Sequence, residues 1–210
     1  MPPVSLTDGQ AALIVLDVHR FTASRDGGYA RLARERGIVR ELNEYYDQVD
    51  QVLPNLGRLV GGCRAHGLPV IFTRLVARGP SDVTPQAITT GFWAQAGSDD
   101  AEFLPELGPQ TGDVVFDKTS TGAFTGAAFH SLLRERRIHA LVIAGVLANG
   151  TVEQTARDAA DLGCGVIVVS DACAAETWAI HGFVMTTVVG GLIRTRSTSA
   201  VLEMLDGRRT

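Results

Sequence analysis

Three side chains that could perform proton transfer and nucleophilic attack each follow an apolar run of the sequence. Asp17 comes directly after AALIVL, Lys118 ends GDVVFDK, and Thr151 follows ALVIAGVLANG. Apolar runs without polar alternation are typical of strands buried on both faces of a parallel sheet. The carboxyl ends of such strands share one edge, where open α/β sheets form their sites. We therefore expect the three side chains at that edge.

The chemistry of these residue types indicates a hydrolytic site. The charge of Lys118 would favour the ionised form of Asp17, which could then transfer a proton. Thr151 begins a helical pattern, and backbone N–H groups at a helix start converge on whatever lies above the strand ends. A nucleophile, a base and oxyanion donors would then be complete. From spacing alone, Asp17 could instead cap a turn and Lys118 could be a surface lysine.

The elements that must position these residues alternate between strands and helices. This order predicts an α/β fold with a single domain over residues 1–210, doubly wound, with a six-stranded, mostly parallel sheet and helices on both faces in three layers. We expect strands at 11–16, 69–73, 112–117, 140–144, 166–169 and 192–195, and helices at 39–66, 129–137, 151–162, 177–189 and 198–205.

Two segments interrupt this alternation. Pro54 falls inside the long helical pattern and predicts a kink or break near residues 50–51. Residues 74–106 hold many glycines and prolines and form the least regular part of the chain. A long loop in a compact domain commonly carries function, such as a lid or a pocket wall. Phe92 and Trp93 within it could cover a substrate or simply pack the loop down.

The composition is that of a globular domain and excludes several classes of partner. Hydrophobic residues make up 45% and charged residues 20%, and the formal net charge of -4 comes without a basic stripe. Nucleic acid is therefore not an expected partner. Apolar runs reach only about six residues, against the ~20 that span a bilayer, so no membrane is expected. The N-terminal segment does not have the pattern of a secretory signal.

The cysteines and histidines indicate neither disulfides nor a metal. Cys63, Cys164 and Cys173 are an odd, sparse set, which favours a reducing, cytoplasmic location. The five histidines show no HxH or HExxH spacing. Two nucleotide patterns also fail, because Asp117 replaces the second glycine of a P-loop and residues 145–150 do not read G-x-G-x-x-G. We expect no metal and no cofactor.

The sequence resembles the isochorismatase-like superfamily of cysteine hydrolases, which includes nicotinamidases, N-carbamoylsarcosine amidohydrolases and ureidoacrylate or biuret amidohydrolases. The segments that carry the resemblance are ALIVLDVHRF, LPVIFTR, GDVVFDKTSTGAF and AGVLANGTVEQTARDAADLGCGVIVVSDACAA. It implies a hydrolase domain with a six-stranded parallel sheet, a small-molecule substrate and a homodimer or homotetramer. It also implies Asp17 as the acid/base and Lys118 as its partner.

The same resemblance implies a particular turn before the helix. A cis peptide between Val146 and Leu147 and a turn through Gly150 would aim the amides of Leu147 and Thr151 into an oxyanion hole. Thr151, however, occupies the position of the family's nucleophilic cysteine. A thiol at a helix start ionises readily, whereas a threonine hydroxyl needs a base that takes its proton during attack. The nicotinamidase metal ligands are missing as well, since residues 73–83 contain no histidine.

Three functions follow from this departure. The chain could be a cysteine-independent hydrolase in which Asp17 is a general acid, as for a vinyl ether, and Thr151 positions water or substrate. It could be an amidohydrolase in which Thr151 is a weak nucleophile or traps the substrate. It could also bind a small molecule without turnover. Apolar side chains that could line the pocket or belong to the core are Phe21, Trp93, Phe124, Leu147 and Trp178. Residues 185–193 could form a subunit contact or lead into a buried strand.

Overall fold

The central strand of the sheet is β1 (Ala11–Leu16), whose six side chains are all buried. The computed structural model describes residues 4–207. β1 pairs in parallel with β2 (Val70–Ala77) on one side and with β5 (Ala140–Val146) on the other. Because β1 and β5 have neighbours on both edges and helices over the sheet faces, their sequences are apolar throughout rather than alternating.

The expectation of a parallel sheet is confirmed, and every pairing between its strands is parallel. The sheet continues from β5 to β6 (Gly165–Ala174) and β7 (Arg194–Arg196), while β4 (Val114–Lys118) joins β2. The sheet has seven strands rather than six. The additional strand, β3 (Ala94–Gln95), has two residues and pairs with the end of β2, so it is too short to show a periodicity in the sequence.

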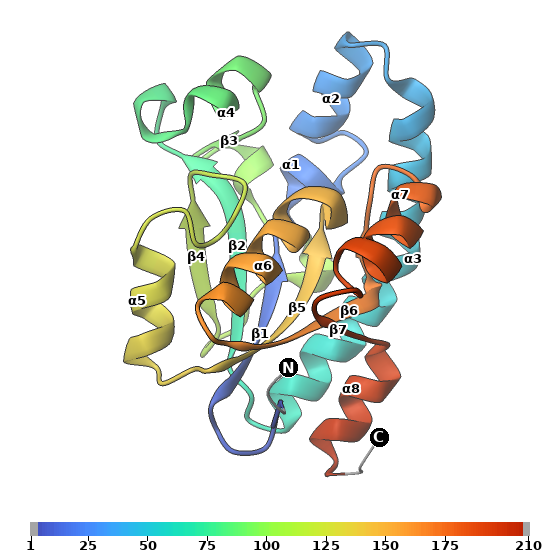
Figure 1. Cartoon of the computed structure of the whole chain (residues 1–210). Helices are drawn as coiled ribbons and strands as arrows, with labels where there is room; N and C mark the ends of the chain where they lie inside the picture. Colours follow the sequence, from blue (N-terminus) through green and yellow to red (C-terminus); the bar gives the residue numbers. More distant parts are fainter. Residues whose placement is uncertain (1–3, 208–210) are drawn as a thin grey trace.

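Helices cover both faces of the sheet (Figure 1). α5 (Ala128–Glu135) and α6 (Glu153–Asp161) lie on one face, and α3 (Val39–Ala65) packs against β6 and α8 (Thr198–Leu205) on the other. Chain crossovers that move in opposite directions from β1 place their helices on opposite faces, which is the doubly wound arrangement.

The predicted break in the long helix is wrong, because α3 runs without interruption through Pro54. Proline removes one backbone donor, but buried residues on the flanking turns, among them Val52 and Leu56, hold the helix against the rest of the core. The sequence also missed α2 (Gly28–Glu35), whose buried residues are one glycine and two alanines. Its buried face therefore lacks the large aliphatic side chains by which the longer helices were assigned.

Short elements complete the chain. α1 (Arg20–Ala23) follows β1, and α4 (Pro85–Thr90) lies in the segment expected to be irregular. α7 (Trp178–Phe183) continues into a π-helical turn, η5 (Val184–Val188), where one continuous helix was expected. Three 3₁₀ turns span Pro80–Asp82, Asp99–Ala101 and Pro105–Leu107. Within residues 4–207, none of the helices is both long and apolar enough to span a membrane.

Candidate active site

Asp17 lies at the carboxyl end of β1, where the backbone turns away from the sheet. Its φ of 53° is in the left-handed region, which aspartate enters more readily than most residues. The Asp17 N–H donates to Thr73 Oγ1 at 3.2 Å, and that hydroxyl donates to Asp17 Oδ1 at 2.8 Å. Thr22 Oγ1 donates to the Asp17 carbonyl. Backbone and side chain of Asp17 are thus both fixed, chiefly by β2.

Lys118 reaches the same carboxylate from the end of β4. Its Nζ lies 2.7 Å from Asp17 Oδ2, and the two side chains are 2% and 1% exposed. Nζ also donates to the carbonyls of Ser120 and Thr121, both at 2.8 Å. The three donors of an ammonium group are therefore matched by three acceptors. Burial lowers the pKa of Lys118, and the adjacent Asp17 carboxylate acts in the opposite direction.

β4 is not adjacent to β1, because β2 lies between them. Lys118 therefore bridges a gap of about 10 Å, two strand spacings of ~4.8 Å, with its extended side chain. Thr73 of β2 occupies the intervening position and completes the shell around Asp17. The sequence did not single out Thr73, although it ends the apolar run of the expected second strand and the strand-end rule applies to it equally.

Thr151 enters from the turn after β5. This turn, η4 (Ala148–Val152), is π-helical and leads directly into α6. Thr151 is 2% exposed, and its Oγ1 donates to Asp17 Oδ2 at 3.2 Å. The N–H groups of Gly150 and Val152 both donate to the Leu147 carbonyl at 3.2 Å. The structure therefore brings Asp17, Lys118 and Thr151 together at a single carboxylate oxygen.

The backbone before this turn shows two features of a tightly constrained site. The peptide between Val146 and Leu147 is cis, which confirms the expectation from the resemblance. Gly145 has a φ of 124°, and a Cβ at this position would lie 2.2 Å from the Leu16 carbonyl oxygen. Only glycine permits that approach, which brings the end of β5 close enough to β1 for Thr151 to meet Asp17.

A cavity of about 280 Å³ opens beside Thr151. Its wall combines residues of the η4 turn with residues from the α2 and α4 regions and from the end of β6. Phe92 and Tyr29 form part of the wall, with ring centroids 5.2 Å apart. The lining residues are Tyr29, Arg36, Ile38, Leu75, Thr84, Gln86, Ala87, Thr90, Phe92, Thr121, Leu147, Asn149, Gly150, Thr151 and Glu176.

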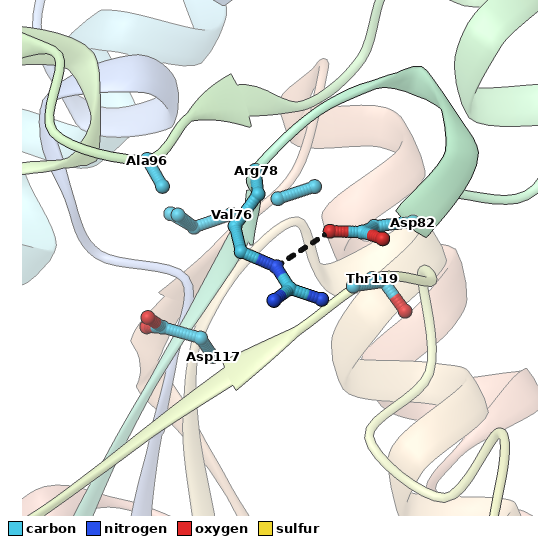
Figure 2. Close-up of a pocket in the computed structure, with 7 residues that line it drawn as sticks. Val76, Arg78, Asp82, Ala96, Asp117 and Thr119 are labelled. Carbon is cyan, nitrogen blue, oxygen red and sulfur yellow. Dashed lines mark hydrogen bonds and ion pairs between the residues drawn. The ribbon is translucent and has the colours of Figure 1, made fainter.

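A second, larger hollow of about 440 Å³ lies near the outer end of β2 (Figure 2). Arg78 extends across it and pairs with Asp82 at 2.9 Å. Asp117 and Thr119 also line it, but Asp17, Lys118 and Thr151 do not. We therefore place the candidate site in the smaller cavity, where the reactive groups are.

Four aromatic residues expected at the pocket wall lie elsewhere. Phe21 and Trp93 line a separate surface depression. Phe124 stacks edge-on against Phe129, with centroids 5.1 Å apart, and Trp178 is 45% exposed. The cavity wall instead contains Leu147, as expected, and Phe92, which the sequence offered as a possible substrate cover. It also contains Tyr29, Asn149 and Glu176, which the sequence did not single out.

Two of these unforeseen residues lay within reach of sequence reasoning. Glu176 follows the end of β6 and so belongs to the same sheet edge as the other site residues. Asn149 lies two positions before Thr151. Tyr29 comes from α2, a helix that was not predicted from the sequence.

The three cysteines lie outside the cavity. Cys63, Cys164 and Cys173 are all free thiols, and none of them lines the cavity. Burial raises the pKa of Cys63 and of Cys173 to about 12 in each case. Within residues 4–207, no group of three or more His, Cys, Asp or Glu side chains is placed to hold a metal ion.

A family model described as the isochorismatase domain matches residues 11–197. The chain belongs to the isochorismatase family. It is 34% identical over 177 residues to YwoC of Bacillus subtilis, an uncharacterised isochorismatase family protein, covering 81% of this chain and 89% of that one. It is 30% identical over 194 residues to the ureidoacrylate amidohydrolase RutB of Pseudomonas syringae pv. syringae, covering 81% and 73%.

The fold of this isochorismatase-family chain is shared with a solved cysteine hydrolase from Pseudomonas syringae pv. phaseolicola. The TM-score is 0.81 at 22% identity, over 94% of this chain and 93% of the other. Family membership and the amidohydrolase relative identify the chain as a hydrolase.

Proposed function

We propose that the chain hydrolyses a C–N bond of a small amide or ureido compound, with Asp17 as the proton-transfer group, Lys118 as its charge partner and Thr151 as the attacking group. The observation that carries this proposal is the meeting of Lys118 Nζ and Thr151 Oγ1 at Asp17 Oδ2. The amidohydrolase activity named for RutB supports the choice of a C–N bond.

The geometry suggests the following sequence of proton and electron movements. Asp17 takes the Thr151 hydroxyl proton as Oγ1 attacks the carbonyl carbon of the substrate. The amides of Leu147 and Thr151 are the proposed donors to the resulting oxyanion. As the C–N bond breaks, Asp17 returns its proton to the leaving nitrogen. A water molecule then cleaves the Thr151 ester, with Asp17 again accepting a proton and passing it back to Thr151 Oγ1.

Lys118 has an electrostatic part in this scheme. Its ammonium group keeps one positive charge next to Asp17, so the carboxylate is available as a base before attack. All three donors of Lys118 are engaged in the structure, which fixes its position. Thr73 supports the other carboxylate oxygen.

Substitutions at Thr151 test the role of the hydroxyl. On a panel of small amides and ureido compounds, with ammonia release as the readout, Thr151→Ser should remain active. Thr151→Ala should lower kcat by roughly 10³-fold or more, because an attacking group acts as a unit with its base. Thr151→Cys should hydrolyse the same compounds at least as fast as the parent chain. Equal rates for Thr151→Ala and the parent chain would rule out the attack by Thr151.

A second candidate reaction is hydrolysis of an enol ether by water, with Asp17 as the general acid. The observation that favours it is the Thr151 hydroxyl, which donates to Asp17 and retains lone pairs that could hold a water. Here Thr151→Ala should slow turnover of isochorismate-type enol ethers by only about 10-fold, the value of one hydrogen bond. Turnover that survives Asp17→Asn unchanged would contradict both reactions.

The proposal includes two expectations from the sequence. They are a cytoplasmic location, suggested by the sparse cysteines, and assembly into a homodimer or homotetramer. Size-exclusion chromatography with light scattering would test the second.

A further inference from the structure

Glu176 places a carboxylate in the wall of the candidate cavity without a basic partner. It is half-buried and follows the end of β6. Tyr29 Oη donates to Glu176 Oε1 at 3.4 Å, and Asn149 Nδ2 donates to Oε2 at 3.3 Å. Within residues 4–207, Glu176 forms no salt bridge with a Lys, Arg or His side chain.

The two neutral donors only partly satisfy this carboxylate. Both contacts are at the long end of the hydrogen-bond range, and an ionised carboxylate offers about four acceptor positions. Tyr29 does not supply a charge. Burial, followed by the proximity of Glu176, raises the pKa of its phenol, so it remains a neutral donor. A partly buried carboxylate in such surroundings gains free energy when a cation occupies its remaining acceptor positions.

The other charges of the site do not compensate Glu176. Asp17 and Lys118 form a closed pair of zero net charge. Arg36 is exposed, and its Nη2 donates to the Thr90 carbonyl. Arg36 lines the same cavity, but within the described part of the chain it forms no ion pair with Glu176, so the remaining acceptor positions of this carboxylate are open to a cationic ligand.

We propose that Glu176 determines specificity by binding a cationic nitrogen of the substrate, an ammonium, amidinium or guanidinium group, at a distance from the scissile bond. As a statement about turnover, this rests on the proposed C–N hydrolysis; as a statement about binding, it does not. The substrate would be a small amide or ureido compound with a positively charged end. A substrate with a carboxylate at the same position, as the name ureidoacrylate describes for the relative, would be repelled.

Three probes of matched length test the charge preference with the intact parent chain. 4-Guanidinobutyramide is cationic, 4-ureidobutyramide has the same shape but is neutral, and adipamate is anionic. Titration calorimetry should give the tightest binding for the guanidino compound, by roughly 10-fold to 100-fold over the ureido compound, the range for hydrogen bonds to a charged group. Equal or tighter binding of the neutral or anionic probe would overturn the inference, as would no measurable binding of the cation at millimolar concentration.

Glu176→Gln links the preference to this residue. The substitution keeps the shape and removes the charge, so it should abolish most of the preference for the guanidino compound and change the affinity for the ureido compound by less than about 3-fold. Glu106→Gln is the matched control, because Glu106 is exposed and does not line the cavity. A preference that survives in Glu176→Gln would also contradict the inference.

The binding and ammonia-release measurements can refute the charge preference and the proposed reaction separately. Tight binding of the cation without ammonia release would leave the inference standing and overturn the proposed reaction. Ammonia release from all three amides at similar kcat/KM would support the reaction and overturn the inference.

Discussion

Replacing Lys118 by methionine removes the cation beside Asp17 while keeping most of the volume of the side chain. Both side chains are almost completely buried, and the Nζ–Oδ2 distance is 2.7 Å. The variant would leave the Asp17 carboxylate in the interior with only the Thr73 and Thr151 hydroxyls as side-chain donors. Breaking a buried pair from one side costs about 3–5 kcal/mol, because the remaining charge has lost its partner.

A double-mutant cycle with Asp17→Asn separates this effect from loss of packing. Asp17→Asn alone strands the Lys118 cation and should cost a similar ~3–5 kcal/mol. The double variant has no stranded charge, so its loss should fall short of the sum of the two single losses by about 2–3 kcal/mol. Urea unfolding followed by circular dichroism gives each free energy of unfolding. Additivity within about 0.5 kcal/mol would refute the direct coupling of Asp17 and Lys118.

A neighbouring ion pair provides the control cycle. Arg74 Nε lies 2.7 Å from Asp117 Oδ1 on the same two strands, β2 and β4, but the Asp117 side chain is 44% exposed. Solvent screening limits such pairs to about 1 kcal/mol or less. The cycle of Arg74→Met with Asp117→Asn should therefore show much weaker coupling, in spite of the similar distance.

Two further predictions concern residues around the site. Burial lowers the pKa of His19, so the unfolded chain binds more protons below about pH 6.5, and the free energy of unfolding should fall by up to about 1.4 kcal/mol per pH unit from there down to the folded pKa. His19→Gln should flatten this slope when unfolding is measured against pH, and an unchanged slope in the variant would contradict the assignment to His19. Gly145→Ala should lower the free energy of unfolding by more than about 2 kcal/mol, because the added Cβ would collide with the Leu16 carbonyl. Gly163 also has a positive φ but no atom within 4 Å of an added Cβ, so Gly163→Ala should lower it by only about 1 kcal/mol. Similar melting temperatures for both glycine variants would contradict the collision.

The strands and the three reactive residues were predictable because two simple rules agree at these positions. Buried parallel strands have continuous apolar sequences, so β1 was assigned with its observed bounds of residues 11–16. Side chains just after such strands collect at one edge, which placed Asp17, Lys118 and Thr151 near one another. The turn with its cis peptide came from the family resemblance, since no local pattern specifies it.

The part of the cavity wall that does not come from the sheet edge was not predictable by the same rules. It depends on α2 and α4, helices of only eight and six residues that were not predicted, and on how they pack over the sheet edge. Large aromatic residues were expected at the pocket wall, but Trp178 is 45% exposed outside the cavity, and Phe21 packs edge-on against Phe92 with ring centroids 5.4 Å apart. Burial of a side chain depends on tertiary packing, which a list of apolar residues does not contain.

A hydroxyl rather than a thiol as the proposed attacking group at Thr151 has a consequence for the conditions under which the site can operate. A nucleophilic thiolate is converted by peroxide to sulfenic and higher acids and is blocked by alkylating reagents. A threonine hydroxyl undergoes neither reaction, and the three thiols present lie outside the cavity, with Cys63 and Cys173 buried. The reaction proposed for this cavity would therefore continue under oxidising conditions that inactivate a cysteine hydrolase. The attacking oxygen is in turn a weaker nucleophile than a thiolate.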